Sequence, residues 1–387
     1  MKNIMLISNG DKSKRQDANN IKMESFYAPC IKALGKENYN IFAGINADIK
    51  DTKDCDGVHY FNQNVYRSIF SIKDNWKAYK NINAIIKKYN IDIIHCNSPI
   101  GGLLGRICGR KNKVKTVIYT AHGFHFYKGN SAIKNLIFKK IEKHLARYTN
   151  AIIVMNNEDY ENAKKFKLKN GGKVYKINGI GVNSKEIDNI KVDIKKKKQE
   201  LGVRDDEFVI VSSGDLIKRK NHSAAIDVVL KLEGINYKYL ICGNGPEYDV
   251  LKNKIEKNNK KDAIRLLGFR SDVKEILKIA DLFLFTSLQE GLPRSLMEAM
   301  SAGLPCVVSN VRGNNDLIRN KLGGFCCNSV NDYEKAIKYI HNNKNVKNKM
   351  SKYNKNIIKQ YDIEVVTGQM KQIYTKEGII ESKKTLL

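Results

Sequence analysis

Short apolar runs alternate with longer amphipathic stretches along almost the whole chain, and this alternation restricts the possible folds more than any other feature of the sequence. Runs such as NIMLIS, DIIHC and KTVIYT, and later FVIVSS, YKYLICG and LFLFTS, have the length and composition of buried strands. Strands that are apolar throughout belong to parallel sheets covered by helices on both faces. The pattern therefore predicts an α/β protein with doubly wound parallel sheets and helices over 77–89, 131–147, 246–258 and 330–341.

The alternation pauses in the polar, lysine-rich stretch 178–205. A chain of 387 residues is long enough for two domains, each with its own core. We therefore place the domain boundary in this pause, which gives a first domain of residues 1–180 and a second domain that begins at 181. Doubly wound sheets bind ligands beyond the carboxyl ends of their strands, so two such domains predict a ligand cleft between them.

The chain is strongly basic, with 69 Lys and Arg residues against 40 Asp and Glu and a formal net charge of +29. Such an excess attracts polyanions, which include nucleic acids, anionic lipids and phosphorylated substrates. Part of it is a compositional bias, because Lys, Asn and Ile are all abundant. A nucleic-acid-binding protein is an alternative argued from charge alone. The chain has no recognition-helix, RNP-like or zinc-finger pattern, so we expect no nucleic-acid partner.

The cysteines indicate a reducing compartment. All 8 are scattered, and none forms a CxxC pair of the kind that binds zinc. The apolar stretch at the N-terminus is too short for a signal peptide, and no run approaches the roughly 18 apolar residues of a spanning helix. We therefore expect a cytoplasmic protein.

The most informative motif is LFLFTSLQEGLPRSLMEAMSAGLPCVVS. It predicts a strand over 282–285, a loop with Glu290 and Gly291, and a helix with Pro293 in its first turn. Free amides at a helix start form an anion site. Carboxylates such as Glu290 and Glu298 suit the vicinal hydroxyls of a ribose or a sugar. The motif indicates a nucleotide-like ligand, and the alternative is that both carboxylates are simply solvated.

A second motif, SSGDLIKRKNHSAAI, places Lys218, Arg219 and Lys220 where a strand turns into a helix. Cations at such a turn can hold a diphosphate. The alternative is an exposed basic turn.

Two further motifs follow strands of the first half. In VIYTAHGFHFYKG, His122 lies at the end of a strand and is either a site residue or a structural histidine. The HxxH spacing of His122 and His125 has no companion ligand, so we expect no bound metal. In NSPIGGLLGR, Gly101 and Gly102 either admit an acceptor phosphate or pack a helix against the sheet. The chain contains neither GxGxxG nor GxxxxGK[ST], which argues against a dinucleotide-dependent dehydrogenase.

The string EGLPRSLMEAMSAGLPCVV resembles the signature of family-4 retaining glycosyltransferases of GT-B architecture, E-G-x-x-x-x-x-x-E-A-M followed by G-x-P-V-V. The string AHGFHFYKG is typical of the branch that builds capsule, exopolysaccharide or lipid-linked oligosaccharide. The resemblance implies two Rossmann-like domains, with the acceptor bound by 1–180 and the nucleotide-sugar by 181–361. It also implies that the segment 362–387 crosses back to the first domain.

The same resemblance implies the activity and its partners. The expected reaction transfers a sugar, with retention, from a UDP-hexose or UDP-N-acetylhexosamine to a hydroxyl of a lipid-linked saccharide. Neither a cofactor nor a metal is expected. The enzyme would lie at the inner face of the plasma membrane, on an anionic surface. A nucleotide-sugar epimerase or a phosphorylase of the same fold is the alternative, and the paired glutamates argue against it.

The resemblance assigns roles residue by residue. The catalytic residues would be His122, Lys220 and Glu290, with Glu290 on the donor sugar and Glu298 on the ribose. Asp215 stands where the family has an arginine, which leaves open whether Lys218 or Arg219 replaces it. The remaining nucleotide-sugar contacts would come from Gly214, Lys218, Arg219, Gly243, Phe269, Arg270, Gly291, Leu292, Ser295 and Leu296. The acceptor side would be formed by Gly10, Gly101, Gly102, His125 and Tyr127.

The predicted helix over 131–147 is both amphipathic and basic. Anionic lipid headgroups would attract its lysines. The alternative is an apolar stripe that faces the core beneath a solvated basic face. The stripe consists of Ile133, Leu136, Ile137, Ile141, Leu145 and Tyr148.

Overall fold

A computed structural model describes residues 1–10, 16–18, 21, 23, 26–66, 68 and 70–381. The chain folds as two compact units, Met1–Gly181 with Ile363–Leu387, and Val182–Asp362. The boundaries predicted from the sequence lie after residues 180 and 361. Residues 382–387 of the predicted crossover segment lie outside the described residues.

Unit 1 is built on an eight-stranded sheet, counted over the described residues, with the order β3-β4-β2-β1-β5-β6-β7-β8. Its strands are β1 (Lys2–Ile7), β2 (Tyr39–Ile45), β3 (Thr52–Cys55), β4 (Val58–Asn62), β5 (Ile93–Asn97), β6 (Thr116–Ala121), β7 (Ala151–Val154) and β8 (Lys173–Lys176). Its helices are α1 (Ala28–Leu34), α2 (Ile72–Lys88), α3 (Pro99–Lys111), α4 (Ala132–Ala146), α5 (Asn157–Ala163) and α15 (Ile363–Lys376).

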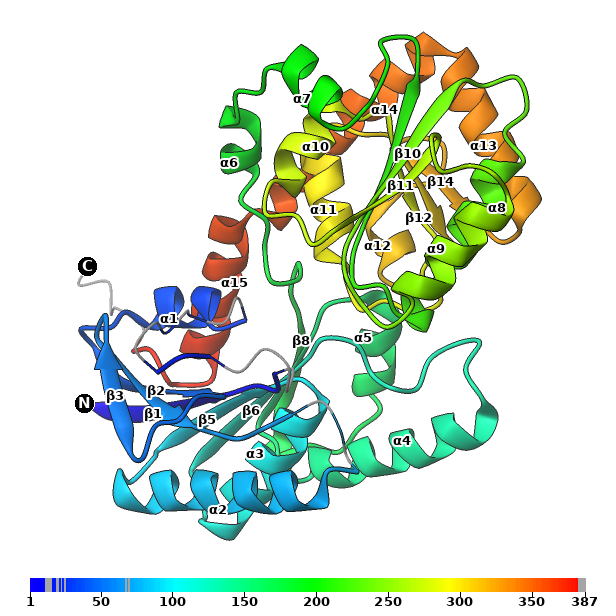
Figure 1. Cartoon of the computed structure of the whole chain (residues 1–387). Coiled ribbons are helices and arrows are strands. Elements are labelled where there is room, and N and C mark those ends of the chain that lie inside the picture. The colour runs from blue at the N-terminus through cyan, green and yellow to red at the C-terminus, as the bar shows by residue number, and fades with distance from the viewer. Residues whose placement is uncertain are drawn as a thin grey trace, which may run out of the picture. The chain divides into compact units, whose positions relative to one another are not determined.

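Helices cover both faces of this sheet, because its central strands are apolar throughout. Figure 1 shows α2, α3 and α4 on one face, with α1 and α15 on the other. The side chains of α2 and α3 pack with those of β1, β5 and β6 in one continuous core. Helix α15 packs against α1, so the end of the described chain completes unit 1.

One part of unit 1 departs from the predicted parallel sheet. Strands β3 and β4 pair antiparallel as a hairpin at its edge. The β3 sequence TKDC is polar and has no fully buried side chain, so it lacks the apolar character on which the predicted strands were chosen.

Unit 2 contains a six-stranded sheet within the described range, in the order β11-β10-β9-β12-β13-β14, with every pairing parallel. Its strands are β9 (Phe208–Ser213), β10 (Tyr237–Cys242), β11 (Ile264–Gly268), β12 (Leu282–Phe285), β13 (Cys306–Ser309) and β14 (Gly324–Cys327). Its helices are α6 (Ser184–Asn189), α7 (Ile194–Glu200), α8 (His222–Leu230), α9 (Tyr248–Lys257), α10 (Val273–Ile279), α11 (Arg294–Ser301), α12 (Asn314–Leu317), α13 (Val330–Asn342) and α14 (Lys344–Ile357).

The predicted doubly wound α/β class is confirmed in both units. Helices α8, α9 and α13 pack on one face of the second sheet, and Figure 1 shows α10 and α11 on the other. The helices predicted over 131–147, 246–258 and 330–341 are α4, α9 and α13, whereas the helix predicted over 77–89 begins earlier, at Ile72. No helix in the described part of the chain combines the length and apolar character needed to cross a membrane.

Candidate active site

In unit 2, Lys220 and Glu290 form an ion pair at the carboxyl ends of two neighbouring strands. Lys220 follows β9, and Glu290 lies in the loop after β12. Lys220 Nζ donates a hydrogen bond to Glu290 Oε1 at 2.7 Å, and it lies 4.7 Å from the centroid of the Phe285 ring. The side chains are only 11% and 6% exposed. Two residues that sequence reasoning selected separately therefore meet in one partly dehydrated position.

The basic turn before α8 directs its three cations differently. Arg219 Nη1 donates to the Gln289 carbonyl at 2.7 Å and to Glu290 Oε1 at 3.2 Å. Lys218 and Asp215 are exposed. Of the two residues that might replace the family arginine, Arg219 is therefore the one that contacts Glu290.

Glycines allow the ends of β9 and β10 to approach each other closely. Gly243 has a φ of +155°, and a Cβ placed there would lie 1.9 Å from the Gly214 carbonyl oxygen. Gly214 in turn has the Lys220 side chain beside it, with Cε 3.5 Å from the position of a Cβ. A larger residue at Gly243 would displace the Gly214 turn, so this glycine allows the turn to stay close to the end of β10.

Helix α11 begins at Arg294, and Pro293 caps it with a ψ of 122° rather than lying in its first turn as predicted. The amides of Ser295 and Leu296 are therefore in the first turn, where the residue four positions back is outside the helix and supplies no intrahelical partner. The side chains of Leu292 and Leu296 are buried, so these two residues can offer a ligand only backbone groups. Gly291 lies between Glu290 and this turn.

Glu298 lies one turn further along α11. Its Oε1 accepts a hydrogen bond from Arg294 Nε at 3.0 Å. The Glu298 side chain is 15% exposed and that of Arg294 is 47% exposed. A ligand hydroxyl would replace a half-exposed arginine, which is a smaller cost than breaking a buried pair.

The structure adds residues that sequence reasoning missed. Arg312 is 5% exposed, and its Nε donates to the Glu290 carbonyl at 3.1 Å. Gly313 has a φ of +80°, and a Cβ there would lie 2.4 Å from the Gly291 carbonyl oxygen. Both follow β13, so their position after a strand was the available signal. Together they fix the backbone of the Glu290 loop from behind.

His222, the first residue of α8, is also buried in this region. Its burial, together with the positive charge of Lys220, lowers the pKa of the imidazole to about 4. Its Nε2 has no hydrogen-bond partner among the described residues. A neutral histidine thus lies next to the cationic turn.

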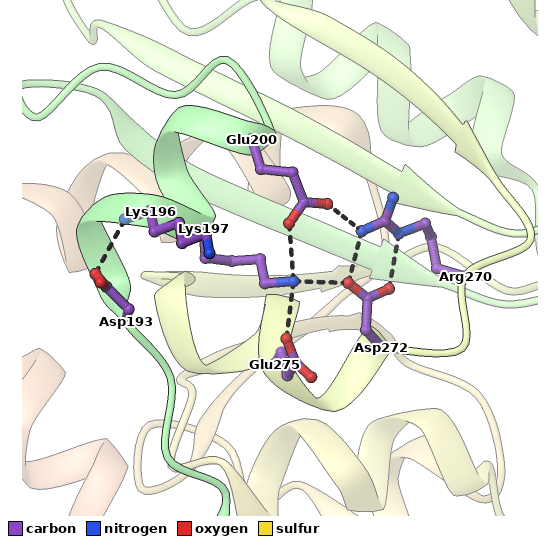
Figure 2. Close-up of polar contacts among 7 residues, drawn as sticks. All are labelled: Asp193, Lys196, Lys197, Glu200, Arg270, Asp272 and Glu275. Carbon is purple, nitrogen blue, oxygen red and sulfur yellow. Dashed lines mark hydrogen bonds and ion pairs between the residues drawn. The ribbon is translucent and has the colours of Figure 1, made fainter.

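The turn after β11 carries Phe269 and Arg270. Arg270 donates to Asp272 at 2.7 and 2.6 Å and to Glu200 on α7 at 2.5 Å. Lys197 bonds the same two acids and Glu275, as Figure 2 shows. The Arg270 guanidinium is thus held by carboxylates of its own unit and ties the turn to α7.

Phe269 differs from its neighbour, because its side chain is 76% exposed. This turn therefore presents a ligand with backbone groups and an aromatic ring.

In unit 1, His122 lies directly after β6. Its Nε2 is 3.1 Å from Asn97 Oδ1 at the end of β5, and the Phe26 ring lies 4.6 Å away. Burial lowers the pKa of His122 to about 4, so the ring is neutral at physiological pH. Because Asn97 Oδ1 can only accept, Nε2 carries the proton and Nδ1 is an acceptor.

Two asparagines at these strand ends were not selected from the sequence. Asn97 is 2% exposed and Asn9, after β1, is 9% exposed. Asn97 Nδ2 and Asn9 Oδ1 are buried without a hydrogen-bond partner in the described part of the chain. Buried polar atoms of this kind are costly unless a ligand or water satisfies them.

The glycines predicted for the acceptor side contact protein atoms. A Cβ on Gly102 would lie 2.3 Å from the Tyr119 ring, and one on Gly101 would lie 3.0 Å from the Ser8 backbone. The packing of α3 against the sheet accounts for both. A Cβ on Gly10 would lie 2.7 Å from Asn46 Nδ2, and the Gly10 amide donates to the Val65 carbonyl at 3.0 Å.

His125 and Tyr127 lie in the loop between β6 and α4. The His125 ring lies 5.2 Å from that of Phe138 on α4. The Tyr127 backbone amide donates to Asn135 Oδ1 at 3.1 Å, and its carbonyl accepts from Asn135 Nδ2 at 3.0 Å. Across the described residues, no three His, Cys, Asp or Glu side chains group closely enough to hold a metal ion.

Comparison with known proteins identifies the class. The sequence matches the family "Glycosyl transferases group 1" over residues 193–357 and "Glycosyl transferase 4-like" over residues 6–157. It is 33% identical over 324 residues to the UDP-Gal:alpha-D-GlcNAc-diphosphoundecaprenol alpha-1,3-galactosyltransferase of Escherichia coli, covering 81% of this chain and 83% of that enzyme.

Solved structures share the fold at low sequence identity. Sucrose-phosphate synthase from Thermosynechococcus elongatus superposes with a TM-score of 0.81 at 17% identity, covering 98% of this chain and 99% of that one. HepE of Anabaena in complex with UDP gives a TM-score of 0.72 at 17% identity, covering 97% and 100%. Two parallel-sheet units of this kind define the GT-B fold, as predicted.

The chain is therefore a glycosyltransferase. It belongs to the group 1 and 4-like glycosyltransferase family, the family that its paired-glutamate motif indicated.

Proposed function

We propose that this enzyme transfers a sugar from a UDP-hexose or UDP-N-acetylhexosamine, with retention of configuration, to a hydroxyl of a polyprenyl-diphosphate-linked saccharide. The observation that carries the proposal is the convergence of Lys220 and Arg219 on Glu290 at a strand end, next to the first turn of α11, whose amides have no side-chain cap within the described residues. This is a set of positive groups around one carboxylate, and a sugar diphosphate needs both kinds of group.

The donor half of the proposal rests on charge and on two relatives. Lys220, Arg219 and the first-turn amides of α11 would bind the diphosphate, and Glu298 would accept hydrogen bonds from the ribose hydroxyls. The relative from E. coli is named for UDP-Gal, and the HepE structure contains UDP. UDP is therefore the nucleotide to test first.

The proposed mechanism needs no protein nucleophile. The bond from the anomeric carbon to the diphosphate oxygen breaks, and the acceptor oxygen bonds to that carbon on the same face. The acceptor proton passes to the departing diphosphate. Lys220 and Arg219 stabilise the charge that grows on the leaving group, and Glu290, released from Lys220, accepts hydrogen bonds from the donor sugar. We propose that Lys220 and Arg219 stabilise the leaving group without help from a metal ion.

The neutral His122 has a separate role in this proposal. Its Nδ1 would accept a hydrogen bond from a sugar hydroxyl, while Asn97 holds the ring in one tautomer. The unsatisfied amide atoms of Asn9 and Asn97 would bind the saccharide acceptor. The relative from E. coli is named for a diphosphoundecaprenol-linked acceptor, which supports a lipid-linked substrate. An enzyme that acts on such a substrate would operate at the inner face of the plasma membrane.

The experiment is a panel of nucleotide-sugars scored for UDP or GDP release, with a short water-soluble prenyl-diphosphate N-acetylhexosamine as acceptor. We expect UDP release that depends on both acceptor and enzyme, that persists in EDTA and that is lost in Lys220→Ala. Proton NMR of the product should show an α linkage from an α-linked donor. A β product would overturn retention, and release from a GDP-sugar alone would overturn the choice of donor.

A further inference from the structure

Helix α4 exposes a row of large apolar side chains. Ile133, Leu136, Ile137 and Ile141 are 72%, 56%, 51% and 42% exposed, and their spacing places them on one side of the helix. We call these four residues the α4 apolar face. The opposite side of α4 packs on unit 1 through Phe138 and Ala146, and Leu145, four residues after Ile141, is buried near the end of the helix. A stripe that faces the core is therefore the wrong explanation for these four residues.

The apolar surface continues from α4 onto α3. A groove between the two helices is lined by the apolar or aromatic side chains of Ile107, Ile141 and Tyr148, and also by Arg110 and Lys140. Ile107 is 37% exposed. Exposed apolar residues that are contiguous across two helices, rather than scattered singly, mark a surface that contacts something apolar.

The charges around this surface have one sign. Between Arg110 and Arg147 the only acidic residue of the sequence is Glu142. Its carboxylate accepts hydrogen bonds from the buried Arg106 at 2.7 and 3.3 Å and is 13% exposed. Lys134 and Lys143 remain exposed at the two flanks of the α4 apolar face, and Lys140, four residues after Leu136, is exposed on the same side of the helix. The matching surface must therefore be apolar and anionic at once.

This charge decides between the two most obvious occupants. A second copy of the chain would bring the same lysines together, and like charges across an interface disfavour association. The surface of an anionic bilayer offers phosphates to the lysines and acyl chains to the isoleucines. Helices with lysines on a polar face and large apolar residues opposite lie in that interface.

Helix α4 is also firmly connected to the loop that carries His122. Asn135 bonds both the amide and the carbonyl of Tyr127, and its Oδ1 accepts from Asn130 Nδ2 at 3.0 Å. Figure 1 shows α4 at one end of the layer that α2, α3 and α4 form on one face of the unit 1 sheet. A helix docked on a membrane would thus hold this loop at a fixed distance from the surface.

We propose that α4 lies in the plane of an anionic membrane, with the α4 apolar face below the headgroups and Lys134, Lys140 and Lys143 at the lipid phosphates. The function of this membrane contact rests on the proposed lipid-linked acceptor. The exposed apolar and basic surface of α4 is observed whatever reaction the enzyme catalyses. It goes beyond electrostatic attraction, because it requires insertion of four named side chains.

The test compares full-length variants in co-sedimentation with vesicles of phosphatidylcholine alone or mixed with phosphatidylglycerol. Replacing all four residues of the α4 apolar face by Ser should lower partitioning onto anionic vesicles by about tenfold or more. The matched control replaces Val250, Leu322 and Tyr339 of unit 2, which are 56%, 44% and 49% exposed, and should bind as the wild type does.

Insertion itself is read from tryptophan emission. The chain has a single Trp, Trp76, so Trp76→Phe combined with Ile137→Trp leaves one reporter on the α4 apolar face. Its emission should shift to the blue on anionic vesicles and be quenched by brominated acyl chains. The pair Trp76→Phe and Val250→Trp should show neither effect. Wild-type partitioning by the four-serine variant, or an unshifted Trp at 137, would overturn the proposal.

The outcome is separable from that of the proposed function. The four-serine variant should release UDP from the water-soluble acceptor at the wild-type rate, because it leaves Lys220 and Glu290 untouched. Loss of vesicle binding with normal release supports insertion. Absence of transfer in every variant, the wild type included, would overturn the proposed reaction and leave the vesicle result to stand alone.

Discussion

Acid should destabilise unit 1 through His95, a buried histidine in β5. The ring is fully buried, with Nδ1 2.7 Å from the Tyr374 hydroxyl and Nε2 2.7 Å from Thr120 Oγ1. Burial, and to a lesser extent the neighbouring His122, lowers the pKa of His95 from 6.5 to about 3. Between about pH 6.5 and pH 3, His95 is therefore neutral in the folded protein and protonated in the unfolded chain.

The sign and size of the effect on stability follow from the difference between the pKa of His95 in the folded and the unfolded state. Because the folded pKa is depressed, stability is intact above pH 6.5 and is lost as the pH falls toward 3. Between pH 7 and pH 5 the unfolded state gains most of one proton, which costs about 2 kcal/mol of unfolding free energy. His122, with a folded pKa of about 4, adds to the loss in the same pH range.

The assay is urea unfolding at pH 7 and pH 5, followed by the emission of Trp76. This is the single Trp of the chain and lies on α2, so it reports on unit 1. His95→Gln should lose about 2 kcal/mol less than the wild type between the two pH values. His144→Gln, at an exposed histidine of α4, is the matched control and should behave as the wild type. Equal losses in His95→Gln and the wild type would refute the argument from burial.

Three further predictions concern the donor site. Glu298→Ala should weaken UDP binding roughly tenfold to a hundredfold in calorimetry, because a hydrogen bond to a charged group contributes about 1.5–3 kcal/mol. Lys220→Ala should lower kcat far more than it weakens donor binding, if it stabilises charge that develops on the leaving group. Arg219→Ala should lower turnover on the order of tenfold while Lys218→Ala stays near the wild type, because Arg219 is the one that contacts Glu290.

Each of the three donor-site predictions has a result that would contradict it. Unchanged UDP affinity in a folded Glu298→Ala would remove the ribose role. Equal effects of Lys220→Ala on kcat and on binding would make Lys220 a binding residue only. A larger loss in Lys218→Ala than in Arg219→Ala would show that the turn rearranges when the donor binds.

The fold was largely predictable because its strands are buried on both faces. A run such as LFLF in β12 is apolar at every position, as expected of a strand in the interior of a parallel sheet. Strand β3 escaped prediction because an edge strand need not be apolar, and TKDC is not. Local composition therefore predicts apolar strands well and polar strands such as β3 poorly.

The candidate site was predictable where it follows strand ends. Glu290 and Lys220 were both selected in this way, and the sheet brings their side chains together. The choice between Lys218 and Arg219 was not predictable. The two residues are adjacent in a single 3₁₀ turn, and one step around such a turn changes the direction of a side chain by about 120°. Arg312 was missed because its role depends on a carbonyl 22 residues away.

The two chain segments at the ends of unit 2 run side by side. The Val182 amide donates to the Tyr361 carbonyl at 2.9 Å, and the Ser184 hydroxyl donates to Asp362 at 2.6 Å. Unit 2 is therefore an insertion into unit 1, and its first and last residues are neighbours. Helix α15 carries Tyr374, the partner of His95, and is synthesised after the whole of unit 2. On the ribosome, the second unit can finish folding first, and the N-terminal unit must wait for its last helix.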